Sequence, residues 1–285
     1  MKGCQLANIL EIQEKVSQVG GKLQIPDTDV SLEIPADTLD QARDYCLIQM
    51  RILPTHCYEK YCTSFSSNST VAVELLPNNL KLKHPVQLTL PHCLKLKKDV
   101  EYKAKIFMSH HERNADLHWE ETTDQPYILD ETACTIWLNK FCWVKYEIDD
   151  KIVEAKKIKI FTAAKQLCLP DNIAEIEVGY YLDLPGAGEF LQQNPDFVLA
   201  QRKSFLFLKE GKFPMKVSLQ RVLPSTWHHS APEENEIPFQ TVASSIEYSC
   251  PFVLEQVTKG SDVPICTFTA SQHQRHLEIN VRPKV

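Results

Sequence analysis

The sequence predicts an all-β protein, with two tandem β-sandwich-like domains preceded by a short N-terminal helix. Three observations lead to this fold class. Short runs that alternate apolar and polar residues recur along the chain, and turn-forming clusters such as Pro26-Asp-Thr-Asp separate them. The 285 residues, 43% of them hydrophobic, are about twice the length of one domain of roughly 150 residues.

The first 19 residues are predicted to form a helical extension. Apolar residues from Leu6 to Val16 recur at approximately helical spacing, and Gly20-Gly21 is a good helix stop.

Residues 20–148 are predicted to form the first β domain. Its expected strands are Lys22 to Ile25, Val30 to Ile34, Cys46 to Leu53, Thr70 to Leu76, Val86 to Leu90, Tyr102 to Met108, Tyr127 to Leu129 and Cys134 to Tyr146. A charged stretch follows, so that residues 149–155 are interpreted as a linker.

Residues 156–285 are predicted to form the second β domain. Its expected strands are Lys156 to Ala163, Ile173 to Leu182, Ser204 to Leu208, Met215 to Leu223, Phe239 to Val242, Phe252 to Gln256, Ile265 to Thr269 and His276 to Val281. Residues 185–194 are expected to form a turn and a short helix. The segment from Pro224 to Pro238 is expected to be a mobile surface loop.

Charge and composition narrow the partners and the location. The net charge is −6 and the cations are scattered among acids, which argues against nucleic acid or an anionic membrane as a partner. No apolar run is long enough for a membrane span, and residues 1–20 lack the features of a secretory signal. The sequence therefore predicts a cytoplasmic protein.

The ten cysteines are interpreted as reduced core thiols, because they are too dilute for a disulfide scaffold. His56-Cys57 and Cys62 could supply part of a zinc site, but no second pair stands at a suitable distance. The pair His228-His229 has no evident partners, so a solvated loop is preferred. No metal and no cofactor is expected.

Two motifs resemble a known interaction domain. The segment Gly20-Gly-Lys-Leu-Gln-Ile-Pro-Asp-Thr-Asp-Val-Ser-Leu-Glu-Ile-Pro-Ala-Asp-Thr-Leu resembles the opening of the ZU5 domain, and the segment from Val73 to Cys93 resembles its central signature. From about Lys156 the chain is similar in pattern to the UPA domain that follows ZU5 in netrin receptors, ankyrins and PIDD. The resemblance implies a protein-interaction or scaffold module of a death-domain-type signalling protein, which regulates a neighbouring effector domain.

The same tandem is the function-to-find domain of inflammasome sensors, in which a Phe-Ser bond breaks spontaneously. The pair that corresponds to it here is Phe141-Cys142. The family's chemistry needs a strained peptide, attack by the following side chain and a nearby base. His118 stands at about the right distance upstream to be that base, and His110 and His111 are weaker candidates. Ser64-Phe65-Ser66 lies ahead of the central signature and is rejected as the cleavage site.

Three functions therefore remain open. The first is an interaction module whose exposed strand edges bind death-fold or other proteins. The second is a single-turnover autoprotease that cuts between Phe141 and Cys142, with His118 as the base. The third is an ankyrin-like cytoskeletal or endocytic adaptor. A conventional enzyme is not expected, since no phosphate-binding loop or nucleophile elbow occurs. The oligomeric state and the partner are not predicted.

Overall fold

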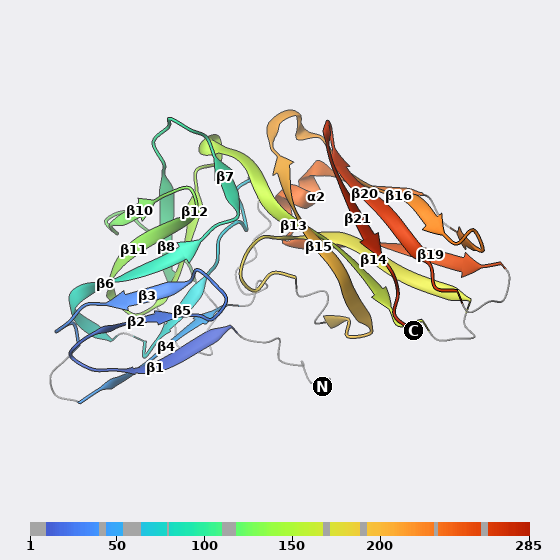
Figure 1. Ribbon diagram of the computed structural model, residues 1–285. Coiled ribbons are helices and arrows are strands. Elements are labelled where there is room, and N and C mark those ends of the chain that lie inside the picture. The colour runs from blue at the N-terminus through green and yellow to red at the C-terminus, as the bar shows by residue number, and fades with distance from the viewer. Residues whose placement is uncertain are drawn as a thin grey trace. The chain divides into compact units, whose positions relative to one another are not determined.

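The alternating sequence forms antiparallel strands through most of the chain, as predicted for an all-β protein. The computed structural model describes residues 10–39, 44–53, 64–78, 80–109, 118–167, 172–188, 193–230, 233–257 and 262–285. The chain divides into two compact units (Figure 1). The first contains Met1–Val153 with Leu184–Gly186, and the second contains Glu154–Asp183 with Ala187–Val285.

The first unit contains two sheets. Sheet A has the order β1-β4-β5-β12-β8-β9, and sheet B has the order β10-β11-β6-β3-β2. The strands of sheet A are β1 (Glu11–Val16), β4 (Cys46–Ile52), β5 (Val73–Leu76), β8 (Ala104–Ser109), β9 (Glu120–Thr122) and β12 (Trp143–Ile148). The strands of sheet B are β2 (Gly21–Gln24), β3 (Ser31–Ile34), β6 (Lys81–Pro91), β10 (Tyr127–Leu129) and β11 (Ala133–Lys140), and the short strand β7 (Leu94–Leu96) follows β6.

Alternation along the strands places one apolar face of each sheet in a common core. Tyr146 of sheet A is fully buried, and its hydroxyl donates a hydrogen bond to the backbone oxygen of Leu90 in sheet B at 3.0 Å. The Thr70 hydroxyl donates to the backbone oxygen of Tyr146 at 2.6 Å. Burial raises the pKa of Tyr146 well above its ordinary value, so this phenol remains a hydrogen-bond donor.

The second unit is also built from two sheets. Sheet C has the order β15-β13-β14-β19-β17, and sheet D has the order β18-β16-β20-β21. The strands of sheet C are β13 (Val153–Lys165), β14 (Ile173–Leu182), β15 (Phe197–Leu208), β17 (Trp227–His229) and β19 (Glu247–Gln256). The strands of sheet D are β16 (Met215–Leu223), β18 (Glu234–Ile237), β20 (Ile265–Gln272) and β21 (Arg275–Val281).

Aromatic side chains join the two sheets of the second unit. Phe252 of sheet C and Phe268 of sheet D are buried edge to face, with ring centroids 4.8 Å apart. Lys156 is also fully buried, and its ammonium donates to the backbone oxygen of Ala243 at 2.7 Å. This oxygen belongs to the helix α2 (Phe239–Ser244). Two short 3₁₀ turns are also present in the described part of the chain, at Asp150–Ile152 and Glu210–Lys212.

Four local predictions were wrong. Residues 11–16 of the expected N-terminal helix form strand β1, because they pair with β4 from Glu11 opposite Arg51 to Val16 opposite Cys46; residues 1–9 lie outside the described part. The expected strand Phe239 to Val242 is helix α2, which starts after Pro238 and buries Val242 and Ala243. The expected loop 224–238 contains strands β17 and β18. Residues 189–192 of the expected short helix are not described.

The fourth difference lies at the end of the first unit. The expected single strand from Cys134 to Tyr146 is two strands, β11 in sheet B and β12 in sheet A. Phe141 and Cys142 form the corner at which the chain crosses from one sheet to the other. Among the described residues, none of the helices has the length and apolar character that crossing a membrane requires.

Candidate functional site

The corner at Phe141-Cys142 holds both residues of the predicted cleavage pair. Both side chains are buried, Phe141 completely and Cys142 to 1% exposure. The backbone oxygen of Cys142 accepts a hydrogen bond from the Leu75 amide at 3.1 Å. Neither residue is among the described positions with a left-handed backbone, such as Asp37 and Asn68. The corner is therefore tightly packed, and neither of its two residues has a positive φ or a cis peptide bond.

Burial controls the chemistry of the Cys142 thiol. It raises the pKa of this thiol to about 12, and the charge of Lys140 opposes the shift to a smaller extent. At pH 7 only about one such thiol in 10⁵ is ionised. Nucleophilic attack from this position would therefore need a base that removes the proton during the reaction.

His118, the predicted base, has an exposed side chain. Its neighbour Trp119 packs against a buried cluster that contains Leu53, Ala72 and Trp143. His110 and His111 lie outside the described residues. Phe65 of the rejected Ser64-Phe65-Ser66 segment is buried, and this segment forms turns with the Ser64 hydroxyl 2.6 Å from that of Ser67.

The outer face of sheet A carries an ordered cation beside this cluster. The Lys145 ammonium lies 5.0 Å from the centre of the Phe107 ring and 5.3 Å from that of Trp119, and it donates to Glu147 at 3.0 Å. Only 6% of the Lys145 side chain is exposed. The two rings and the carboxylate hold the Lys145 ammonium in place. Its charge is therefore already used within the sheet and is not available to bind a partner.

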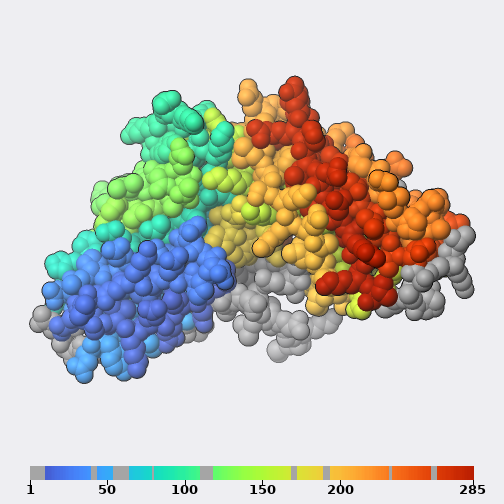
Figure 2. Space-filling model, in the orientation of Figure 1, coloured from blue at the N-terminus to red at the C-terminus, as the bar shows by residue number. Residues whose placement is uncertain are grey.

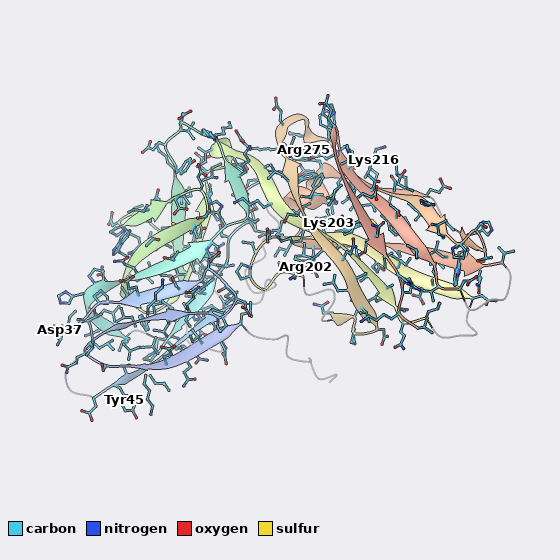
Figure 3. The ribbon with its side chains drawn as sticks, viewed as in Figure 1. Asp37, Tyr45, Arg202, Lys203, Lys216 and Arg275 are labelled. Atoms are coloured by element: carbon cyan, nitrogen blue, oxygen red, sulfur yellow. The ribbon has the colours of Figure 1, made fainter. Side chains whose placement is uncertain are left out.

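An exposed apolar surface lies at the other end of sheet A. Tyr45 and Leu47 are 50% and 47% exposed, and they project from the same face of the chain at the start of β4. Lys15 of the edge strand β1 lies opposite Leu47, with its ammonium 4.6 Å from the centre of the Tyr45 ring. Figure 3 labels Tyr45 at this edge. We call Lys15, Tyr45 and Leu47 the β1–β4 patch.

The other residues singled out in the sequence do not form a site. His228 and His229 lie on strand β17, so the loop interpretation of this pair was wrong, and His229 packs against Phe252 with ring centroids 5.5 Å apart. His56, Cys57 and Cys62 lie outside the described residues. Six cysteines in the described part are free thiols, and five of these are buried. In the same part, no three His, Cys, Asp or Glu side chains gather as metal ligands would.

Comparison with known proteins finds a family match within the first unit. Residues 13–109 match the family model of the ZU5 domain. This segment is a ZU5 domain. It begins within β1 and ends with β8, so the β1–β4 patch lies inside it. The ZU5 resemblance predicted from the two sequence motifs is thereby confirmed.

The similarity to complete proteins extends beyond the ZU5 domain. Over 92% of its length the chain is 24% identical to netrin receptor UNC5D of Mus musculus, and the same figures hold for netrin receptor UNC5D of Rattus norvegicus. The aligned region is 28% of each receptor, so the chain spans little more than a quarter of the curated relatives it matches.

Sequence reasoning missed the β1–β4 patch. The sequence predicted a strand that contains Leu47. Whether the Leu47 side chain is exposed depends on which face of that strand packs against the core. The alternation Ile48, Met50, Ile52 marks the buried face and assigns Leu47 to the other side. Tyr45 is two residues before Leu47, so its exposure could have been inferred from the same alternation.

Proposed function

We propose that this chain is a protein-interaction module of a cytoplasmic, death-domain-type signalling protein, with the ZU5 domain followed by a UPA-like second unit that regulates a neighbouring effector domain. The ZU5 match and the alignment with netrin receptors over most of the chain support this proposal. The structural observation that carries it is the β1–β4 patch within the ZU5 domain.

The β1–β4 patch has the composition of a protein-binding surface. An exposed tyrosine supplies a large, rigid contact area, and Leu47 extends its apolar part. The adjoining strand β1 is an edge of sheet A, which offers free backbone groups to an added strand. A partner that covers this patch would bury two apolar side chains that are now half exposed.

Substitution of Leu47 by glutamate tests this surface. We expect partners captured by the full chain to be reduced about tenfold in Leu47→Glu, because a charge placed in an apolar contact must be desolvated on binding. The measurement is affinity capture followed by quantitative mass spectrometry.

The matched control is Ile128→Glu on edge strand β10 of sheet B, where the native residue is 60% exposed. Equal capture by wild type and both variants would refute a role for the patch. Capture of a spectrin-like helical protein through the patch would favour the ankyrin-like adaptor.

Self-cleavage between Phe141 and Cys142, with His118 as the base, is our second proposal. The observation that favours it is the placement of this pair at the corner, between the end of β11 and the start of β12. With His118 as the base that takes the thiol proton, the Cys142 sulfur would attack the carbonyl carbon of Phe141, the bond from that carbon to the Cys142 nitrogen would break, and the freed amine would take up a proton. Water would then hydrolyse the thioester to the Phe141 carboxylate and the free Cys142 thiol.

Intact mass under denaturing, reducing conditions tests cleavage. Denaturation is needed because β12 lies between β5 and β8, which would keep the two fragments associated. Fragments whose masses meet between Phe141 and Cys142, and which are absent from Cys142→Ala, would establish cleavage. Loss of these fragments in a folded His118→Ala protein would support His118 as the base. A single species near 32.7 kDa would exclude constitutive cleavage.

A further inference from the structure

Two edge strands of the second unit run alongside each other without forming a backbone ladder. They are β15 of sheet C and β21 of sheet D (Figure 2, amber and red). Side chains join them near one end. There the backbone amide of Asn280 donates a hydrogen bond to the side-chain oxygen of Gln201 at 3.0 Å, and the Lys203 ammonium donates one to the backbone oxygen of Glu278 at 2.7 Å. At the other end, β15 is joined to the end of β20, next to the start of β21. The buried Gln272 side chain accepts a hydrogen bond from the backbone amide of Leu208 at 2.7 Å and donates one to its backbone oxygen at 2.9 Å.

These contacts show which backbone groups point out of the sheets. Leu208 uses its amide and carbonyl to bind Gln272, so both point away from the neighbouring strand β13. Because these directions alternate along an antiparallel strand, the backbone groups of Leu206, Ser204 and Arg202 also point away from β13. On β21, the hydrogen-bonded backbone groups of Asn280 and Glu278 point away from β20. By the same alternation, the backbone groups of His276 also point away from β20.

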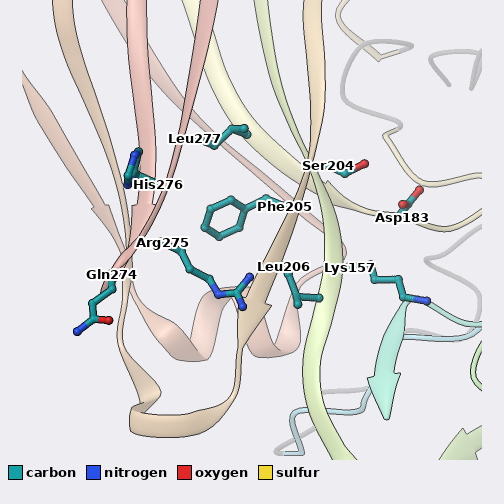
Figure 4. Close-up of a pocket in the computed structure, with 9 residues that line it drawn as sticks. All are labelled: Lys157, Asp183, Ser204, Phe205, Leu206, Gln274, Arg275, His276 and Leu277. Atoms are coloured by element: carbon teal, nitrogen blue, oxygen red, sulfur yellow. The ribbon is translucent and has the colours of Figure 1, made fainter. Parts of the chain in front are cut away.

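The span between the two sets of bridges is open. A hollow of about 620 Å³ lies there, lined by Ser204 to Leu206 of β15 and by Arg275 to Leu277 of β21 (Figure 4). It therefore lies where Ser204, Leu206 and His276 present outward backbone groups. Unlike the ends of the two strands, this stretch has no side-chain bridge among the described residues.

The hollow is locally basic, although the whole chain has a net charge of −6. Lys157 and Arg275 line it and Arg202 follows along β15, and in the described structure the side chains of these three cations form no hydrogen bond or ion pair. Figure 4 shows the Arg275 guanidinium extended toward Leu206. The lining acid, Asp183, is neutralised by Lys159 at 3.0 Å.

We propose that this hollow binds an acidic, extended segment of a partner protein, which pairs with the free edge of β15 at Ser204 to Leu206. The backbone groups of these residues would bind the segment's main chain, and the Arg275 guanidinium, which extends toward Leu206, would bind its carboxylates. Phe205 and Leu277 supply the apolar lining for the alternate side chains. The inference rests on the proposed interaction function and assigns to the second unit a separate surface and partner chemistry.

A short fluorescein-labelled peptide of alternating glutamate and valine is the probe, and a lysine–valine peptide is its counterpart. We expect fluorescence polarisation to show that the full chain binds the acidic peptide at least about tenfold more tightly than the basic one, and that Arg275→Glu weakens binding about tenfold. Arg221→Glu is the matched control, because Arg221 is an exposed arginine of the same unit on β16, which β20 separates from β21.

Two further measurements keep the test decisive. Arg202→Glu provides a second charge reversal if Arg275→Glu does not fold, as judged by thermal unfolding. Amide NMR shifts at Ser204 and Leu206 on addition of the acidic peptide should mark the edge. Equal binding of the two peptides, or equal loss in Arg221→Glu and Arg275→Glu, would overturn this inference. Partner capture that depends on Leu47 would be unaffected by that result, so the two proposals fail separately.

Discussion

Replacement of Arg51 by methionine is expected to lower the free energy of unfolding of the first unit by about 3 kcal/mol. Arg51 of β4 forms an ion pair with Glu74 of β5, whose side chain is fully buried. Methionine keeps much of the volume but leaves the carboxylate buried without its partner. The expected loss is at the low end for a buried pair because 23% of the Arg51 side chain is exposed.

Urea unfolding followed by tryptophan fluorescence measures this effect, since Trp119, Trp137 and Trp143 are in the first unit and Trp143 lies opposite Glu74. The double variant Arg51→Met, Glu74→Met should recover most of the loss, because it removes the unpaired charge. Lys105→Met is the control, as it breaks an exposed ion pair with Glu121 in the same sheet and should have a far smaller effect. If the Arg51 and Lys105 variants lose the same stability, the buried pair does not have the role assigned to it.

Truncation of Phe141 to alanine is expected to cost about 3 to 5 kcal/mol in the same assay. The ring is fully buried at the corner between β11 and β12, so its removal leaves a cavity where the chain changes sheets. Phe141→Leu should lose much less because it fills most of the space.

Phe213→Ala is a useful contrast for this experiment. Phe213 is 40% exposed and stacks on His273 with ring centroids 4.5 Å apart, so its loss should be smaller. A fully folded Phe141→Ala protein with wild-type stability would show that the corner does not depend on this ring.

The sequence predicted most strands because burial follows alternation. Ile173–Leu182 and Met215–Leu223 have the observed bounds of β14 and β16. The corner could not be recognised in this way. Even-numbered residues from Cys134 to Leu138 and from Cys142 to Tyr146 are all buried, since both strands face the core between the same two sheets. The same even-numbered positions are therefore buried before and after the corner. For this reason the alternation of apolar and polar residues predicts one continuous strand.

The remaining errors have a common physical cause. Residues 11–16 and 234–237 are rich in charge, and their strand conformation depends on pairing with β4 and β16, which local sequence does not reveal. Conversely, Phe239, Thr241 and Val242 are of residue types that favour strands. They nevertheless form a helix, in which Val242 and Ala243 are buried. The candidate surfaces were hidden for the same reason, because an exposed Leu47 or a free edge at Ser204 is defined by neighbours distant in sequence.

The position of β12 in sheet A has a consequence for biosynthesis. This strand joins β5 to β8, with Val144 opposite both Val73 and Met108, yet it is the last strand of the sheet to be synthesised. In a ribosome-bound chain that ends before Trp143, the β1-β4-β5 and β8-β9 parts of sheet A are not joined by backbone pairing. We therefore expect sheet A to be completed only after Ile148 has left the exit tunnel, since its central pairing must wait for the last strand.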